Sequence, residues 1–278
     1  MAKSGKASMT PMKAPIAAPV ATLAVRERKP AKTPIRKMAP AITRPIQKTS
    51  GIDGRDYRTA EREDSAGDWH RRALPAKFGR VKLLAFSDLH RDLGQAAELV
   101  AMSAEADVVI GAGDFASVHE GLGETIDALA GIEAPTVLVP GNNETDEALR
   151  EAAADWAAAT VLHGEGATIG GVPFYGLGAG VPVTPWEWSF DLDDGAAGSM
   201  LSGCPDGAVL VLHSPPRGHC DTNGSGDHFG SPALLRAIEE KAPRLAVCGH
   251  IHESWGCESR IGETPVRNLG PKGAWIEL

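Results

Sequence analysis

Three patterns that would place this chain of 278 residues in a familiar class are missing from it. No segment approaches the roughly 18 consecutive apolar residues that a membrane-spanning helix needs. None of the four cysteines forms a C-x-x-C pair, so their spacing indicates neither a zinc ribbon nor a disulfide framework. No internal repeat of the solenoid kind is present. These absences favour a globular protein that is not embedded in a membrane, and the cysteine pattern predicts a reducing, cytoplasmic setting.

Basic residues are scarce over most of the chain but abundant at its start. Residues 1–48 carry eleven Lys or Arg against a single acid, Glu27, whereas the whole chain has a net charge of −8. This start is also rich in Ala and Pro and almost free of aromatics, a composition that cannot bury enough apolar surface to fold. We therefore predict a disordered basic tail and linker over residues 1–78 and one folded domain over residues 79–278. A tether to nucleic acid or an anionic surface is the alternative to a plain solvated extension.

From residue 80 onward, short apolar runs alternate with helical patterns, which is typical of βαβ units. Two sheets packed face to face, with helices outside, would fit this order. Thr145 and Ser231 are expected to cap helices, the second with Pro232 in its first turn. We expect helices over 96–104, 119–130, 144–158 and 231–241. We expect strands over 81–86, 108–110, 136–139, 161–162, 168–169, 172–175, 209–212, 245–248, 255–258, 265–268 and 274–277.

Five short polar segments each follow a predicted buried strand, in a fixed order along the chain. Because the carboxyl ends of strands in α/β sheets gather at one edge, we expect these segments to meet there. They supply two Asp, one Asn and four His, the inventory for two metal ions bridged by one carboxylate. Such a mixed oxygen and nitrogen set suits Mn, Fe or Zn better than calcium, and it contains no thiolate. The segments are Asp88-Leu89-His90, Gly113-Asp114, Gly141-Asn142-Asn143-Glu144, Leu212-His213-Ser214 and Gly249-His250-Ile251-His252.

In these segments the chain resembles the calcineurin-like metallophosphoesterase superfamily, and within it the small metallophosphodiesterase branch. The family signature is D-x-H, G-D, G-N-H-[DE], H and G-H-x-H, and the resemblance spans about residues 81–278. It implies an α/β fold with four layers, in which two mixed β-sheets are flanked by helices. It also implies in-line attack on phosphorus by a hydroxide that bridges the two metals. The implied ligands are Asp88, His90 and His252 for the first metal, Asn142, His213 and His250 for the second, and Asp114 as the bridge.

One position departs from the family signature, because Asn143 stands where many relatives have a His thought to assist the leaving group. An amide cannot transfer a proton at neutral pH, so a general acid worth roughly 10²–10⁴ in rate is missing or comes from elsewhere. The Gly-rich segment after His213 offers replacements. We favour His228 over His219 as a group near the substrate, and Arg217 as a phosphate ligand. A surface position is the alternative for each.

The sequence therefore predicts a metal-dependent phosphoester hydrolase, and a phosphodiesterase more specifically, acting on a small-molecule phosphoester that could be a nucleotide. The alternatives are a phosphomonoesterase, a nuclease recruited by the basic tail, and a metal-binding scaffold without catalysis. The aromatic segment 184–190 is either a wall of the substrate site or a hydrophobic plug beneath a long loop. Oligomeric state does not follow from these residues.

Overall fold

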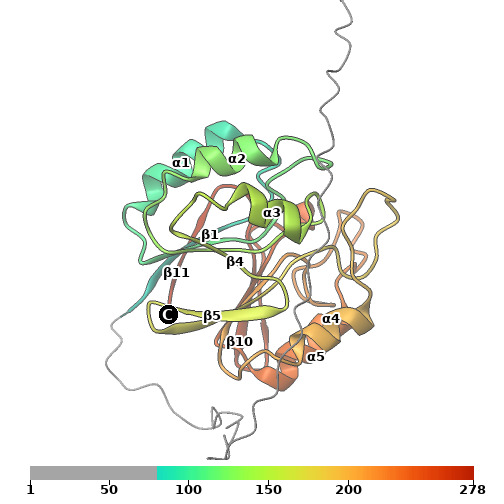
Figure 1. The fold of residues 1–278 in the computed structure, drawn as a ribbon. Helices are drawn as coiled ribbons and strands as arrows, with labels where there is room; N and C mark the ends of the chain where they lie inside the picture. Colours follow the sequence, from blue (N-terminus) through green and yellow to red (C-terminus); the bar gives the residue numbers. More distant parts are fainter. Residues whose placement is uncertain (1–79) are drawn as a thin grey trace, which may run out of the picture. The chain divides into compact units, whose positions relative to one another are not determined.

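The computed structural model describes residues 80–278 (Figure 1). Two mixed β-sheets lie at the centre, with strand orders β11-β1-β2-β3-β4 and β5-β6-β7-β8-β10-β9. The predicted α/β class and its two mixed sheets flanked by helices are confirmed. The predicted disordered tail and linker over residues 1–78 lie outside the described residues. Within the described residues, no helix is long and apolar enough to cross a membrane.

The first sheet contains four parallel strands and one antiparallel edge strand. Its parallel strands are β1 (Lys82–Phe86), β2 (Val108–Gly111), β3 (Thr136–Leu138) and β4 (Ala159–Val161), and β11 (Ala274–Glu277) pairs antiparallel with β1. Three helices cover its outer face: α1 (Leu93–Ser103), α2 (Leu122–Leu129) and α3 (Asp146–Ala152) (Figure 1). This half of the domain carries the first three metal-binding segments.

The second sheet has a parallel centre and an antiparallel strand at each edge. The parallel strands are β6 (Val172–Leu177), β7 (Val209–Leu212), β8 (Leu245–Cys248) and β10 (Thr264–Asn268), and the edges are β5 (Glu165–Ile169) and β9 (Glu258–Ile261). Helices α4 (Asp194–Leu201) and α5 (Pro232–Lys241) pack on its outer face. A short 3₁₀ turn, η1 (His252–Ser254), follows β8.

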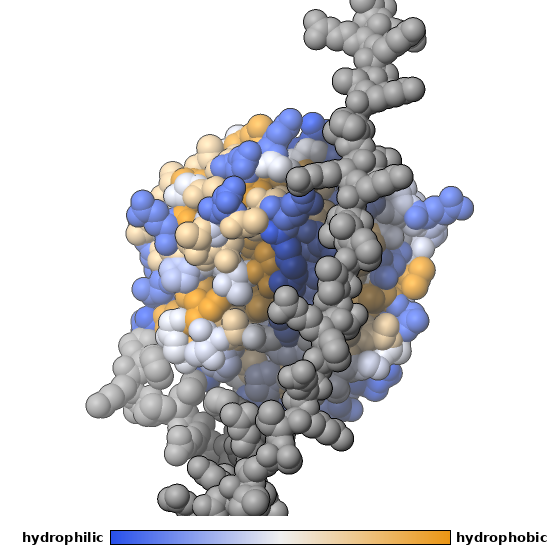
Figure 2. Space-filling view, viewed as in Figure 1, coloured by the Kyte–Doolittle hydropathy of each residue, from blue (hydrophilic) through white to orange (hydrophobic). Residues whose placement is uncertain are grey.

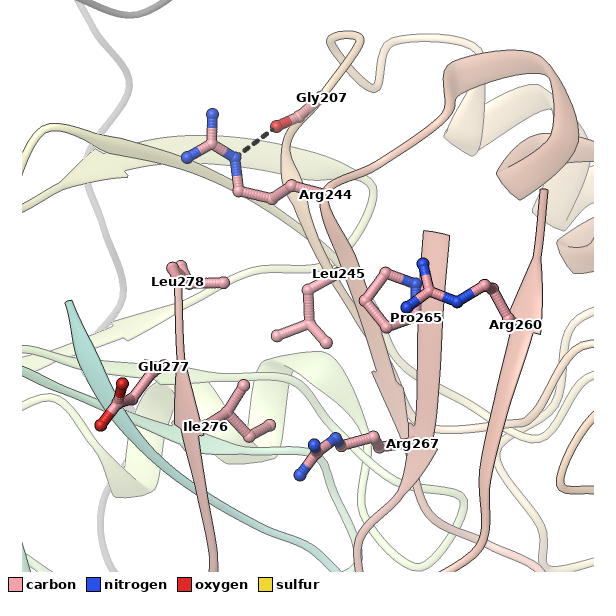
Figure 3. Close-up of a pocket in the computed structure, with 9 residues that line it drawn as sticks. All are labelled: Gly207, Arg244, Leu245, Arg260, Pro265, Arg267, Ile276, Glu277 and Leu278. Carbon is pink, nitrogen blue, oxygen red and sulfur yellow. Dashed lines mark hydrogen bonds between the residues drawn. The ribbon is translucent and has the colours of Figure 1, made fainter. Parts of the chain in front are cut away.

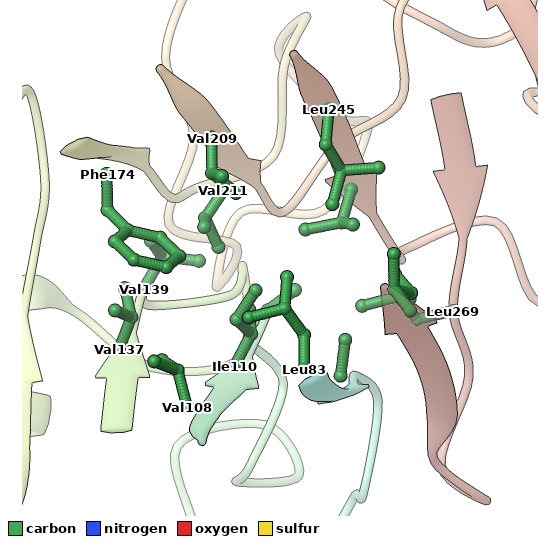
Figure 4. Packing of buried hydrophobic residues seen from close by; sticks show 14 of the residues in the cluster. Leu83, Val108, Ile110, Val137, Val139, Phe174, Val209, Val211, Leu245 and Leu269 are labelled. Carbon is green, nitrogen blue, oxygen red and sulfur yellow. The ribbon is translucent and has the colours of Figure 1, made fainter. Parts of the chain in front are cut away.

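The central core lies between the two sheets (Figure 4). Side chains alternate across each strand, so Leu83 and Ala85 of β1 face this core while Leu84 and Phe86 face the helices on the other side. Because the central strands are buried on both faces, they read as continuous apolar runs in the sequence. The continuous apolar runs could therefore be assigned to strands. The sequence did not reveal which residues of a strand face the core between the sheets and which face the helices.

The helix caps were predicted more accurately than the helix lengths. The Thr145 hydroxyl accepts from the Ala148 N–H at the start of α3, and the Ser231 hydroxyl accepts from the first turn of α5, as expected. Helix α3 ends at Ala152 and not at residue 158, because the chain turns to bury Trp156, whose indole donates to the Ile132 carbonyl at 3.0 Å. Helix α4 was missed, since its two glycines weaken the helical signal.

The cysteine prediction is partly wrong. Cys220 and Cys257 form a disulfide although they lie 37 residues apart. The loop after β7 and the turn after η1 bring them together, which spacing alone could not reveal. Cys248 is a buried, free side chain in β8, as expected, and Cys204 is also free and buried. The disulfide therefore links two loops at the edge of the second sheet.

Candidate metal centre

All five polar segments meet at one rim, formed by the carboxyl ends of parallel strands in both sheets. Asp88 and His90 follow β1, Asp114 follows β2 and Asn142 follows β3. In the second sheet, His213 follows β7 directly, and the segment with His250 and His252 follows β8. The seven side chains predicted to bind metal are thereby brought together from two sheets.

The first group of ligands consists of Asp88, His90 and His252. One donor atom from each lies within 4.8 Å of the others. The Nε2 atoms of His90 and His252 are 3.1 Å apart, and Oδ1 of Asp88 is 3.9 Å from Nε2 of His252. Two imidazole nitrogens and a carboxylate converging in this way make a set that a divalent transition metal ion could occupy.

The second group consists of Asp114, His213 and His250, again with donor atoms within 4.8 Å. The side-chain oxygen of Asn142 joins this group, at 3.2 Å from Nε2 of His213 and 3.0 Å from Nδ1 of His250. Carbonyl oxygen, carboxylate and neutral imidazole can each offer a lone pair to a cation placed among them. The chemistry of both donor sets fits a metal ion.

Asp114 lies between the two groups. Its Oδ2 is 3.6 Å from Nε2 of His90, a member of the first group, and its Oδ1 is 3.4 Å from Nε2 of His213, in the second. Each carboxylate oxygen thus faces a different set of ligands. A carboxylate placed in this way could contact a metal ion in each group.

Backbone carbonyls orient two of the imidazoles. Nδ1 of His90 lies 3.2 Å from the Ala116 carbonyl, and Nδ1 of His213 lies 2.9 Å from the Ala112 carbonyl. A carbonyl only accepts, so in a neutral ring these contacts place the proton on Nδ1 and leave the Nε2 lone pair directed at the centre. Each ring, once neutral, is therefore in the tautomer that binds metal.

A second layer of contacts holds the Asp88 carboxylate. Its Oδ2 accepts from the Ser87 hydroxyl at 2.6 Å and from the Trp255 indole N–H at 3.0 Å. Its Oδ1 accepts from the His250 backbone N–H at 3.0 Å. The Trp255 ring also packs on His252, with ring centroids 4.3 Å apart. Trp255 consequently contacts two ligands of the first group at once.

Asn143 and Glu144 hold the bridging residue and its loop. The Asn143 side-chain amide donates to Oδ2 of Asp114 at 2.8 Å, and its oxygen accepts from the Val118 N–H at 2.8 Å. The buried Glu144 carboxylate accepts backbone N–H groups from Asp114, Gly141 and Ala116, at 2.9, 2.6 and 3.0 Å. Glu144 therefore joins the loop after β2 to the loop after β3, and Thr145 caps α3 in its place.

The backbone at this rim is strained, as is common at functional sites. Asp88, His90, Asp114 and His250 all have positive φ, between 44° and 69°. Gly113 has φ of 89°, and a Cβ there would lie 2.6 Å from Nδ1 of His213. Four non-glycine residues in the left-handed region are costly, and they aim their side chains inward.

Burial and neighbouring charges shift the pKa values of residues in and beside the second group. Burial, followed by the nearby charge of His213, lowers the pKa of His250 to about 4. Burial alone would raise the pKa of Asp114, but the charge and hydrogen bond of His213, together with the charges of His90 and His250, outweigh burial and keep that carboxyl ionised. Burial also raises the pKa of Glu144 to about 7, with the charge of Asp114 adding to the rise. Asp114 and His250 are thus ready to bind a cation at neutral pH.

A cavity of about 680 Å³ opens onto both ligand groups. One side is formed by Trp186 and Trp188, whose rings stack with centroids 5.7 Å apart, and Trp186 is 49% exposed. Phe229, 50% exposed, lines the cavity too. The plug interpretation of segment 184–190 is wrong, because these aromatics face an open cavity beside the ligands.

The three predicted catalytic residues occupy different places. Asn143 lines the cavity, but its amide group is engaged with Asp114 and Val118. His228 and Arg217 do not line it. The Nδ1 of His228 is 2.6 Å from the buried carboxylate of Asp221, and Arg217 donates to the His228 carbonyl at 3.3 Å. The roles proposed for these residues stay predictions.

Sequence reasoning missed the residues that support the ligands. Trp255 was assigned to a strand, whereas it follows the turn η1 and reaches back to Asp88. Glu144 was named only as part of the third polar segment and as the first residue of a predicted helix, and its bridging of two loops was not foreseen. The only signal was position, since both residues lie within four residues of a predicted ligand.

Proteins with similar sequences match part of this chain. A UPF0046 protein of Caenorhabditis elegans is 35% identical over 97 residues, which cover 31% of this chain and 22% of that protein. Human metallophosphoesterase domain-containing protein 1 is also 35% identical over 97 residues, covering 32% of this chain and 28% of that protein. The chain thus spans about a quarter of the length of these relatives.

Solved structures share the fold. A Thermus thermophilus protein superposes with a TM-score of 0.57 at 16% identity, covering 70% of this chain and 91% of that one. A dimetal phosphatase from Danio rerio gives 0.50 at 11% identity, covering 69% and 88%. The model of the calcineurin-like phosphoesterase family matches residues 81–254. With that match over more than half of its length, the chain belongs to the calcineurin-like phosphoesterase family.

Proposed function

We propose that this protein hydrolyses phosphodiesters at a centre of two metal ions. The observation that carries this proposal is the position of Asp114, with one oxygen toward His90 and the other toward His213. Bound metal ions would supply a nucleophilic hydroxide at neutral pH and would offset the charge that develops on the phosphoryl group. Mn, Fe and Zn all suit the ligands: Asp88, His90 and His252 for one ion, and Asn142, His213 and His250 for the other.

The chain's own residues would position the reacting groups. His90 and His213 keep their Nε2 lone pairs inward through the carbonyls of Ala116 and Ala112. The Asn143 amide and the Glu144 carboxylate fix Asp114 from two sides. This rigidity matters because small displacements of catalytic groups cost large factors in rate.

The shape of the cavity favours a diester over a monoester. A diester carries two organic groups on phosphorus, and the wall of Trp186 and Trp188 offers an apolar surface for one of them. The histidines that line the cavity, His90, His250 and His252, all belong to the proposed ligand set. Without a further His to protonate the leaving oxygen, substrates with good leaving groups should react best.

Location and metal identity remain predictions. A cytoplasmic setting was predicted from the cysteine spacing, but the disulfide between Cys220 and Cys257 weighs against it, because disulfides are rare in reducing compartments. Manganese is the metal with which we would begin.

The test is hydrolysis of bis(p-nitrophenyl) phosphate and p-nitrophenyl phosphate by the purified chain, with added Mn²⁺ and with EDTA. The proposal predicts turnover that the chelator abolishes, with the diester preferred. Trp186→Ala should raise KM for the diester more than it lowers kcat, since the wall binds substrate but does not touch phosphorus. Monoester preference would favour the phosphatase alternative, and bound metal without turnover of either substrate would favour the scaffold.

A further inference from the structure

A second cavity, of about 540 Å³, lies at the end of the two sheets away from the metal centre. Figure 3 shows the residues that line it. Leu245, at the start of β8, and Pro265, near the start of β10, form part of it, and Ile276 of β11 contributes from the other sheet. The metal centre lies at the far ends of the parallel strands. Leu245 and His250 are five residues apart, or roughly 16 Å by the rise of an extended strand. The two cavities are separate sites.

Three arginines surround this cavity. Arg244 precedes β8, Arg260 lies on β9 and Arg267 lies on β10, and Figure 3 shows their guanidinium groups around the apolar side chains between them. This clustering runs against the charge of the domain. Residues 80–278 contain only eleven Lys and Arg against 29 Asp and Glu. More than a quarter of the domain's cations therefore converge on one cavity, although like charges repel one another.

Within residues 80–278, two of the three arginines form no ion pair with a carboxylate side chain. Arg244 donates through Nε to the Gly207 carbonyl at 2.9 Å, and Arg260 donates to the Glu263 carbonyl at 2.8 Å. These neutral acceptors orient each guanidinium at one edge and leave its other N–H groups for a ligand. Arg267 differs, because it pairs with Glu258 at 3.1 Å. Among the described residues, the guanidinium groups of Arg244 and Arg260 are thus held by neutral carbonyl oxygens.

The floor of the cavity is apolar. Leu245 and Ile276 belong to the core between the sheets, and Leu278 packs against it. The one acidic side chain in the lining, that of Glu277, is paired with Arg80 at 3.1 Å. The main-chain carboxylate of Leu278 is a further anionic group at this cavity. A ligand here would place an apolar body on the floor and an anionic group at the arginines.

We propose that this cavity binds a small organic phosphate, a phosphate monoester dianion carried on an apolar body. Two guanidiniums match the charge of about −1.5 to −2 that a phosphate monoester carries at neutral pH. Each can donate two parallel N–H groups to phosphate oxygens. The volume lies within the range of ordinary ligand pockets, roughly 300–1,000 Å³. This binding site is independent of the proposed hydrolysis at the metal centre.

The test is isothermal titration calorimetry of the full chain with 1-naphthylphosphonate, whose P–C bond resists hydrolysis. Titrations run with metal-loaded protein and with protein kept in EDTA, at constant ionic strength and mildly alkaline pH. We expect one site in EDTA, retained on metal loading and in His250→Ala. Arg244→Ala and Arg260→Ala should each weaken this binding roughly tenfold or more.

Matched controls separate this site from general charge effects. Arg236 is exposed on α5 and lines neither cavity, so Arg236→Ala removes the same charge and should leave affinity within twofold. Inorganic phosphate and 1-naphthol should each bind more weakly than the phosphonate. Wild-type affinity in both cavity variants, or an equal loss in Arg236→Ala, would overturn the site. Equal affinity for inorganic phosphate would overturn the assigned ligand class.

Discussion

The side-chain amide of Asn143 donates to Oδ2 of Asp114 at 2.8 Å, while its backbone N–H donates to Oδ1 at 2.9 Å. Asn143, which stands where many relatives have a histidine, therefore donates a hydrogen bond to each carboxylate oxygen of Asp114, the proposed bridging residue. Its side-chain oxygen is occupied as well, by the Val118 N–H. We therefore predict that Asn143 positions Asp114, because its amide group is already hydrogen-bonded.

Removal of this amide should loosen the bridge. We predict that Asn143→Ala lowers metal affinity and kcat by roughly 10–100-fold, as is typical when a partner of a metal ligand is lost. Metal binding is measured by competition with a fluorescent chelator, and kcat with bis(p-nitrophenyl) phosphate. Asn143→His tests whether a general acid is missing. If it is, and if the new imidazole reaches the leaving oxygen, activity on substrates with poor leaving groups should rise. Unchanged metal affinity in the alanine variant would contradict the positioning role.

Trp255 should act on the first ligand group alone. Its indole N–H donates to Asp88 and its ring packs on His252, so two substitutions separate these contacts. Trp255→Phe keeps a ring beside His252 but removes the donor, and we expect metal affinity to fall roughly tenfold. Trp255→Ala removes both contacts and should cost more. Equal affinities for wild type and Trp255→Ala would rule out this support.

Metal uptake should depend on pH. Burial would lower the pKa of His213, but the charge and hydrogen bond of Asp114, together with the charge of Asp88 and the Ala112 carbonyl, outweigh burial and raise it to about 9 in the metal-free protein. His213 therefore carries a proton at neutral pH that a metal ion must displace. Affinity should increase as the pH rises from 6.5 toward 9, by about tenfold per pH unit for one released proton. Chelator competition across this range measures the slope, and a flat profile would contradict the coupling between Asp114 and His213.

The cysteines should divide into two classes. Cys220 and Cys257 are bonded, whereas Cys204 and Cys248 are buried thiols, and burial raises the pKa of Cys204 to about 11. In the native, non-reduced protein we expect no thiol to react readily with iodoacetamide, because the reactive thiolate is scarce. Unfolding should expose two thiols, and peptide mapping should recover the linked pair. Four reactive thiols after unfolding without reductant would show that the bond is absent.

The seven predicted ligands could be grouped from sequence because each lies within four residues of the end of a buried strand. A run such as Val209–Leu212 predicts a strand, and its end fixes where His213 must emerge. The two-sheet architecture followed from the same runs. Local patterns of this kind can be recognised in a sequence because they involve only residues that are neighbours in the chain.

Contacts between distant segments could not be predicted in this way. The approach of Trp255 to Asp88 depends on the packing of two sheets, and the Cys220–Cys257 bond depends on two loop conformations. The arginine cavity likewise gathers residues that no motif marks, since Arg244 and Arg260 lie at a loop and an edge strand. Such tertiary relationships leave no periodic trace in the sequence.

The most direct test of the account is the metal content of wild type and Asp114→Asn, measured by elemental analysis beside diester hydrolysis. Asparagine keeps the size of the side chain but removes the charge that faces both ligand groups. The account predicts two metal ions per chain and turnover for wild type, and at most one ion with turnover lost for the variant. An Asp114→Asn protein that holds two ions and hydrolyses the diester at the wild-type rate would contradict the bridging centre.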